Sequence, residues 1–360
     1  MPALCTTDRD PVAPQRCMNM IEASITTRPV RPRRSIVPLL GLVIVAAGLC
    51  VLRYAIDRSP EGEVGLSWPA SEWASFRITA IMACLIVGAG LGIAGALMQS
   101  LLRNPLASPY LLGVSSGAGL GVMAAMAIAA AGGLASAATI DWSLPAMIGA
   151  TGALFVVLAL GRRNGWPDPI TVLLAGVVVA TICAGGMMLL QHMVPMDVRG
   201  RFLTWMMGSI PEIMSRTQLL IAGVAVLIGI GCSLYMGHWL NASLLGDDEA
   251  QSLGVPVGMM RLVLLVLAGM TTAVTVAIAG PIGFVGLIAP HVARRLVGPN
   301  HHVFLPASVL AGIIIVVGAD VARQAIDLGT GRLPIGVLTI LAGGPIFLWL
   351  LRREVHADAS

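Results

Sequence analysis

Apolar runs long enough to span a membrane alternate with short polar turns from residue 36 almost to the C-terminus. A transmembrane helix needs about 20 apolar residues, and most of the runs reach that length. The weak apolar–polar alternation of a membrane β-barrel is absent. The pattern therefore predicts an all-α integral membrane protein with about ten transmembrane helices. We expect them at residues 36–56, 73–100, 110–131, 144–161, 169–193, 217–238, 258–280, 283–297, 303–325 and 334–351.

The eighth run, 283–297, is the weakest of the ten because it is short and contains a proline and a histidine. Residues 1–35 are polar, contain proline and end in a basic stretch, without the apolar core of a secretory signal. We expect them to form a disordered cytoplasmic tail. In this interpretation residues 36–353 are one transmembrane domain, and residues 354–360 are a cytoplasmic C-terminal tail.

Composition supports the membrane assignment and excludes one kind of active site. The chain is 57% hydrophobic and only 11% charged, whereas soluble domains carry about 25% charged residues. All 22 residues of the Lys+Arg count are arginine. A Walker phosphate loop needs its lysine, so this polypeptide cannot contain that ATPase site. No cysteines show metal-ligand spacing. We therefore expect no catalytic residue, no metal site and no cofactor bound by this chain.

Arginine placement predicts the orientation of the helices, because basic residues favour the cytoplasmic side. With the basic tail in the cytoplasm, an even number of helices returns the C-terminus to the same side. The inner turns then carry Arg103, Arg162, Arg163, Arg294, Arg295, Arg352 and Arg353. The outer turns carry arginines interspersed with acidic residues. We expect both termini in the cytoplasm of a multi-pass protein of the bacterial plasma (inner) membrane.

Small residues four positions apart predict close helix packing. Gly88 and Gly92 share one helix face, as do Gly113, Gly117 and Gly121. Small residues at this spacing let two backbones approach closely.

The fifth span has a small, weakly polar character of its own. A surface of this kind lines a pathway for a bulky solute or forms a packing face, and the residues alone do not separate these alternatives. The candidate pathway residues are Thr171, Ala175, Gly176, Thr181 and Gly185.

Few ionisable residues lie within the spans. Asp320 and Arg323 are three residues apart, a spacing that favours a structural ion pair. No series of carboxylates runs through the membrane, as a proton-coupled pump would need. The energy source is therefore expected to lie outside this polypeptide.

The segment LLGDDEAQSLGV, residues 244–255, is acidic and lies between two apolar runs. Three carboxylates follow Gly246, in the first turn of a short helix, where the helix dipole favours negative charge. Gly254 suits the left-handed residue that ends a helix. Residues Ala250 and Leu253 form a short apolar stripe. The segment is either a helical turn in the headgroup region or a contact element for a soluble partner.

Four stretches together resemble the FecCD-type permeases, which are the membrane subunits of ABC importers for ferric siderophores, haem and cobalamin. They are GALMQSLLRNPLASPYLLGVSSGAGLG (95–121), the acidic segment 244–255, GPIGFVGLIAPHVARRLVG (280–298) and LPIGVLTILAGGPIFLWLL (333–351). The resemblance runs from about residue 70 to the C-terminus. It implies a ten-helix type II ABC importer permease fold.

The resemblance also implies partners. A second permease copy, as a homodimer or a heterodimer with a paralogue, completes the pathway. The segment 241–255 meets a cytoplasmic ATPase dimer, which binds the ATP and Mg²⁺. An extracytoplasmic binding protein delivers the substrate from outside, and lipid surrounds the helices. No nucleic acid is implied. The residues assigned to ATPase coupling are Leu245, Gly246, Asp247, Asp248, Glu249, Ala250, Leu253 and Gly254.

Outer-face arginines of such permeases pair with acidic residues of the binding protein, and here the candidates are Arg53, Arg58 and Arg323. Arg332 stands where the family usually has a glutamate, which makes the individual docking assignments weaker. We expect an iron chelate, a ferric siderophore first, as the substrate, with haem or cobalamin as alternatives. An ion-gradient-driven transporter and a membrane-embedded enzyme are the competing classes.

Overall fold

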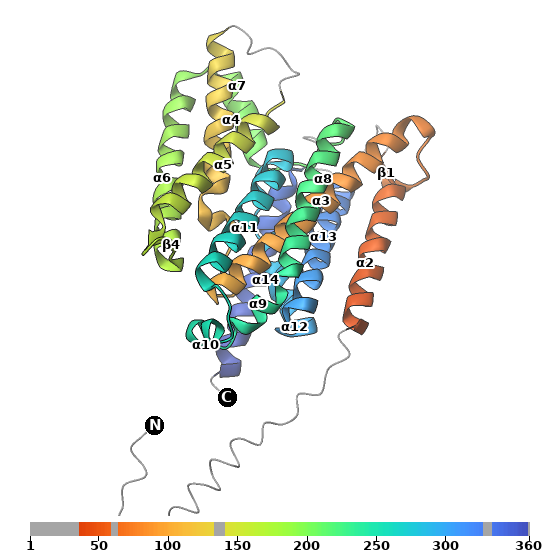
Figure 1. Cartoon of the computed structure of the whole chain (residues 1–360). Helices are drawn as coiled ribbons and strands as arrows, with labels where there is room; N and C mark the ends of the chain where they lie inside the picture. The colour runs from red at the N-terminus through yellow and green to blue at the C-terminus, as the bar shows by residue number, and fades with distance from the viewer. Residues whose placement is uncertain (1–35, 59–63, 133–140, 327–332, 359–360) are drawn as a thin grey trace, which may run out of the picture.

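The computed structural model describes residues 36–58, 64–132, 141–326 and 333–358, and the predicted tail 1–35 lies outside them. Helices dominate these residues (Figure 1). The helices are α2 (Ile36–Ala55), α3 (Ser71–Leu102), η1 (Pro109–Leu112), α4 (Val114–Ala131), α5 (Ser143–Leu160), α6 (Pro169–Met193), α7 (Met196–Met206), α8 (Arg216–Tyr235), α9 (Gly237–Ala242), α10 (Asp247–Ser252), α11 (Val257–Ala279), α12 (Val285–Val297), α13 (His301–Ala325) and α14 (Ile335–Asp358).

Each of the ten predicted apolar runs contains a helix, which confirms the all-α membrane fold. Eight of these helices are long and apolar enough to cross a membrane, and α14 adds a shorter apolar stretch, Ile335–Trp349. Helix α14 continues to Asp358, so residues 354–358 of the expected C-terminal tail are helical.

Two short antiparallel ribbons add strands that the hydrophobic pattern does not predict. Strand β1 (Ile56–Arg58) pairs with β2 (Val64–Leu66) after α2. Strand β3 (Arg162–Arg163) pairs with β4 (Trp166–Pro167) between α5 and α6. The second ribbon turns at Asn164 and Gly165, which both have positive φ angles, as a two-residue Asn-Gly hairpin turn requires.

Helix α3 is the centre of the larger group of helices, which also contains α2, α8 and α11–α14 (Figure 1). The most apolar stretch of α3 is 83% buried, against 11% for α2 at the edge. The predicted packing face of Gly88 and Gly92 is confirmed, because a Cβ at Gly88 would lie 2.7 Å from the Gly312 carbonyl oxygen of α13. Small residues therefore let α3 contact its neighbours backbone to backbone.

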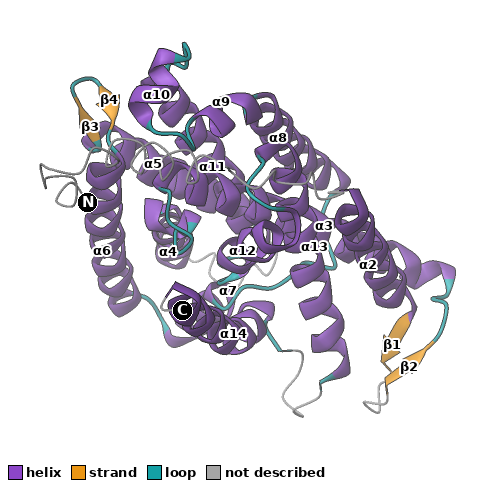
Figure 2. Ribbon diagram, turned by 90° about the horizontal axis from the view of Figure 1, so that it is seen from below, coloured by secondary structure: helices purple, strands orange, loops and turns teal. Residues whose placement is uncertain are grey.

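Helices α4, α5 and α6 form a second group beside the first (Figures 1 and 2). Gly117 and Gly121 pack against Gly149 of α5, as their spacing predicts. Gly113 differs from this expectation. It precedes α4 with a φ of +69°, so it joins η1 to α4 through a left-handed conformation instead of lying within the helical face.

The eighth predicted span contains α12, which is only 13 residues long. At about 1.5 Å per residue it extends about 20 Å, less than the ~30 Å bilayer core. An irregular segment precedes it, with positive φ angles at Gly280 and Phe284. Val285, Ile288 and Ala289 of α12 are buried. Non-helical backbone at membrane depth is tolerated where protein covers it.

The two ends of the helix bundle differ in what they carry. The start of α2, the end of α14 and the short helices α9 and α10 lie at one end, here called the inner end (Figure 1). Helix α7 and the β1–β2 ribbon lie at the opposite, outer end. This arrangement agrees with an even number of crossings between α2 and α14. It places the acidic segment on the same side as both ends of the helical domain.

Candidate functional site

The acidic segment forms a short helix with defined ends. Helix α10 begins after Gly246, which has a φ of +135°. At its other end Gly254 has a φ of +82°, the N–H of Val255 donates to the Ala250 carbonyl at 3.0 Å, and the N–H of Gly254 donates to Gln251 at 2.9 Å. These two bonds form a Schellman motif. The expected helix with glycines at both ends is confirmed.

Asp247 anchors this helix to the bundle. Its carboxylate accepts from the Arg103 guanidinium, Nη2 to Oδ1, at 2.6 Å, and also pairs with Arg261. Arg103 follows the end of α3 and Arg261 lies in the first turns of α11, so one carboxylate joins α10 to two long helices. The same Arg103 nitrogen donates to the Ser243 carbonyl at 2.8 Å. Asp247 therefore faces the bundle, with 37% of its side chain still exposed.

The opposite side of α10 is open to solvent. Asp248 and Glu249 are exposed, and Leu245 and Leu253 are 67% and 65% exposed. Ala250 is fully buried, so the predicted stripe of Ala250 and Leu253 is divided between the two sides of the helix. We name the exposed set the acidic–apolar surface: Leu244, Leu245, Asp248, Glu249 and Leu253.

A second connection joins α9, which directly precedes this segment, to the core through His301, a residue that the sequence did not single out. His301 is fully buried at the start of α13. Its Nδ1 lies 2.9 Å from Asn241 Oδ1 in α9, and its Nε2 lies 2.9 Å from Ser100 Oγ in α3. The sequence shows only that His301, Asn241 and Ser100 are polar residues at the ends of apolar runs. The fold brings the three side chains together. Helix α9, directly before the acidic segment, is thereby fixed to α3 and α13.

The five candidate pathway residues of α6 separate into two groups. Gly176 is buried, and a Cβ there would lie 2.0 Å from the Leu111 carbonyl oxygen, so it is a packing residue. Thr171 donates its hydroxyl to Asp168 at 2.7 Å and its N–H at 3.0 Å. Both hydrogen bonds lower the pKa of Asp168, and the bond from the Thr171 hydroxyl has the larger effect. They also cap the start of α6.

Thr181 and Gly185 lie four residues apart on the exposed side of α6, and Ala175 is half-buried. A Cβ at Gly185 would meet no atom within 4 Å among the described residues. This side of α6 is therefore open among the described residues, whereas Thr171 and Gly176 have contacts within the chain.

At the outer end, four charged side chains form a network. Asp320 is fully buried and pairs with Arg53 and with Arg323, where Nε lies 2.5 Å from Oδ1. Glu212 Oε1 lies 3.4 Å from Arg53 and 3.7 Å from Arg323. The predicted Asp320–Arg323 structural pair is confirmed.

The network changes the interpretation of the docking arginines. Arg53 is 3% exposed and Arg323 is 4% exposed, so their guanidinium groups are held inside the chain instead of being presented at the outer surface. The side chain of Arg58 lies outside the described part of the structure.

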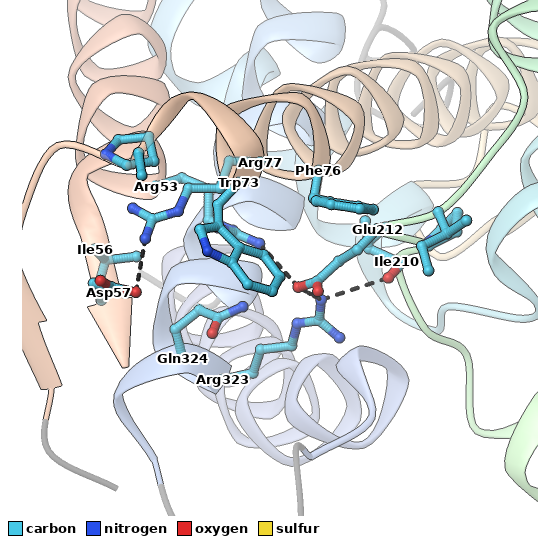
Figure 3. Close-up of a pocket in the computed structure, with 14 residues that line it drawn as sticks. Arg53, Ile56, Asp57, Trp73, Phe76, Arg77, Ile210, Glu212, Arg323 and Gln324 are labelled. Atoms are coloured by element: carbon cyan, nitrogen blue, oxygen red, sulfur yellow. Dashed lines mark hydrogen bonds and ion pairs between the residues drawn. The ribbon is translucent and has the colours of Figure 1, made fainter. Parts of the chain in front are cut away.

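A pocket of about 1130 Å³ opens above this network (Figure 3). It lies between the end of α2, the start of α3, the segment before α8 and the end of α13. Its walls include Ile56, Asp57, Trp73, Phe76, Arg77, Ile210, Glu212, Ile213 and Gln324. Within the described ranges, no group of three or more His, Cys, Asp or Glu side chains is arranged to hold a metal ion.

We expect Asp320→Ala to destabilise the protein strongly, because it leaves two buried guanidinium groups without their shared carboxylate. The expected loss is about 3–5 kcal/mol. Asp197→Ala is the matched control, since its pair with Arg201 is exposed and is worth about 0–1 kcal/mol. Thermal unfolding of both variants in detergent measures the difference. Equal melting temperatures would show that the buried network does not stabilise the fold.

The FecCD transport family matches residues 39–353 of this chain. The match covers most of the sequence, and the chain belongs to this family of ABC importer permeases. It is a multi-pass membrane transport subunit and not a catalytic enzyme.

Two curated relatives match over nearly their whole length. The cobalamin import system permease protein BtuC of Halobacterium salinarum is 35% identical over 94% of this chain and 94% of its own. The vitamin B12 import system permease protein BtuC of Klebsiella pneumoniae is 34% identical over 93% of this chain and 99% of its own.

A solved structure agrees with the fold. An inward-facing conformation of a putative metal-chelate type ABC transporter superimposes with a TM-score of 0.76 at 28% identity, and covers 88% of this chain and 99% of that one.

Proposed function

We propose that this chain forms the translocation pathway of an ATP-driven importer, with an ATPase bound at the acidic–apolar surface and a binding protein at the outer end. The observation that carries the proposal is the anchoring of α10. One side of this helix is tied to Arg103 and Arg261, while the other presents exposed leucines and carboxylates. A protein partner covers such a surface better than anionic lipid, which repels carboxylates.

The connections of α10 suggest how force reaches the membrane. Closure of the ATPase dimer moves α10, and Asp247 transmits that movement to α3 and α11. The contacts of His301 with Asn241 and Ser100 add a link to α13. The central helices then move as a body, and two copies alternate access to a path between them. Thr181 and Gly185 on the open side of α6 line that path in this proposal.

The substrate we propose is a large metal chelate, with cobalamin as the first candidate. Relatives 34% and 35% identical over nearly the whole chain are named as cobalamin or vitamin B12 permeases. The ferric siderophore expected from the sequence stays the second candidate, because the solved structure with the same fold is titled a putative metal-chelate transporter.

Reconstitution tests the proposal and the substrate together. Proteoliposomes contain this chain with its cognate ATPase and binding protein, and uptake of labelled cyanocobalamin is compared with uptake of a labelled ferric siderophore. We expect ATP-dependent uptake of cyanocobalamin. Faster uptake of the siderophore would reverse the order of the two candidates.

A matched pair of controls separates the transporter classes. Vesicles with this chain alone are given a proton or sodium gradient, and we expect no uptake. Gradient-driven uptake in those vesicles would overturn the ATP-driven mechanism. The double variant Asp248→Arg/Glu249→Arg reverses the charge of the exposed surface, and we expect it to reduce ATP-dependent uptake at least ~10-fold by weakening ATPase binding.

A further inference from the structure

Trp166 connects the short β3–β4 ribbon to the first turn of α11. The ribbon lies at the inner end of α6, the same end of the bundle as α10 (Figures 1 and 2). A Cβ added to Gly258 of α11 would lie 2.5 Å from Cδ2 and 2.7 Å from Cγ of the Trp166 indole. The ring therefore lies directly against the α11 backbone, at a position where only glycine leaves room for it.

This contact joins two elements more than it fills the core. Trp166 is still 48% exposed, although its ring touches Gly258. Glycine is also a poor helix former compared with alanine, so propensity does not favour it in α11. Close approach of another group is the usual reason for glycine at such a position. The pair of Trp166 and Gly258 is therefore a connection between the ribbon and α11.

The chain between Trp166 and α6 is short and stiff. Trp166 begins β4, which is paired with β3. Pro167 and Pro169 flank Asp168, and each proline ring fixes its own φ angle. The N–H of Asp168, which precedes α6, donates to the Gly161 carbonyl at 3.0 Å. A displacement of the indole therefore displaces the start of α6 with it.

Gly258 is equally close to α10 along the chain. Val255 and Val257, between α10 and Gly258, are buried, so the connection is packed against the bundle. Arg261, three residues after Gly258, pairs with Asp247 in the first turn of α10. A movement of α10 therefore reaches the first turn of α11 through both the chain and an ion pair.

The charges at this point agree with a short distance between the three helices. The Thr171 hydrogen bonds have the largest effect on the pKa of Asp168, and the positive charges of Arg163 and Arg261 lower it further. Arg261 is thus near both Asp247 of α10 and the residue that caps α6.

We propose that Trp166 is a positioning residue for transport, which holds the start of α6 against the first turn of α11. Helix α6 otherwise packs mainly on α4 and α5. The contact between the indole and Gly258 gives α6 a direct connection to the helix that follows α10. When the ATPase moves α10, this contact displaces the start of α6. The inference rests on the proposed function, which supplies the ATPase and the path, and it adds the residue that links them.

The test measures substrate imported per ATP hydrolysed in proteoliposomes that contain the permease, its cognate ATPase and its binding protein. We expect Trp166→Ala to lower this ratio ~5-fold, within the range for residues along a coupling route. Trp166→Phe keeps a flat ring against Gly258 and should recover most of the ratio. Affinity for the ATPase should not change, because Trp166 lies outside the acidic–apolar surface. Thermal unfolding in detergent verifies that each variant keeps its fold.

A double-mutant cycle isolates the contact. Gly258→Ala places a methyl group against the indole and tilts the ring away, so we expect it to lower the ratio as well. In the Trp166→Ala background the same substitution should have no further effect, because the ring it displaces is gone. Gly152→Ala is the matched control, since a Cβ at Gly152 would meet no described atom within 4 Å.

The outcomes distinguish this inference from the proposed function. A Trp166→Ala variant that imports as much substrate per ATP as wild type would overturn the inference, and so would a Gly258→Ala effect of equal size in both backgrounds. A variant that loses uptake only through weaker ATPase binding would overturn it too. ATP-dependent uptake by the wild-type complex leaves the proposed function standing in all three cases. If the wild-type complex shows no such uptake, the proposed function itself fails, and this inference with it.

Discussion

Replacing Asp247 by alanine is expected to reduce ATP-driven uptake more than ~10-fold while the permease still assembles in the membrane. The carboxylate is the shared acceptor of Arg103 and Arg261, which belong to the ends of two different helices. Without it, two guanidinium groups face each other across the start of α10, and the helix loses its fixed orientation. A change worth about 1.4 kcal/mol in coupling already gives a tenfold effect.

The measurement is the ratio of substrate imported to ATP hydrolysed in proteoliposomes. We expect this ratio to fall in Asp247→Ala, because the ATPase closes without moving α3 and α11. Asp247→Asn keeps one oxygen acceptor, so its ratio of substrate imported to ATP hydrolysed should lie between those of wild type and Asp247→Ala. Asp197→Ala removes an exposed aspartate at the outer end and serves as the control. If Asp247→Ala imports as much substrate per ATP as wild type, the anchor does not transmit the movement.

Replacing Gly95 by alanine is expected to prevent correct folding. Gly95 of α3 touches the backbone of Gly286 in α12 so closely that a Cβ would lie 1.8 Å from the Gly286 carbonyl oxygen. The obstacle is backbone, which cannot move aside as a flexible side chain can. The two helices would have to separate by at least about 1 Å. Overpacking usually destabilises a protein by about 1–3 kcal/mol, and we expect the loss of stability here to reach or exceed the upper value.

Gly152→Ala is the matched control for this substitution. Gly152 lies inside α5, and a Cβ there would meet no described atom within 4 Å. Alanine favours helix over glycine by about 1 kcal/mol, so this variant should be neutral or slightly more stable. Yield of monodisperse protein and thermal unfolding in detergent compare the two. A Gly95→Ala variant as stable as Gly152→Ala would contradict the close crossing of α3 and α12.

Features set by neighbouring residues could be predicted from the sequence. The apolar runs located the helices, because a membrane span is defined by its own length and composition. The short helix of residues 247–252 and its closing Gly254 followed from local turn chemistry. The pair of Asp320 and Arg323 followed from helical spacing, since residues three apart share a face.

The partners of buried polar groups depended on the tertiary structure. Asp247 and Arg103 are 144 residues apart, and Arg53 and Asp320 are 267 apart. Two arginines at the outer ends of helices can have the same neighbours in the sequence, although one pairs with a buried carboxylate and the other faces solvent. The sequence therefore placed Arg53 at the surface, whereas packing of α2 against α13 buried it.

The sequence by itself determined which segments form apolar helices, where several close helix contacts lie and which short segment is acidic. The rotation of each helix about its axis was decided by the neighbours it packs against. That rotation divided the candidate residues of α6 between a packed and an open side, and it turned Asp247 inward and Asp248 outward. Helical periodicity fixes which residues share a face, but only the assembled bundle fixes what that face meets.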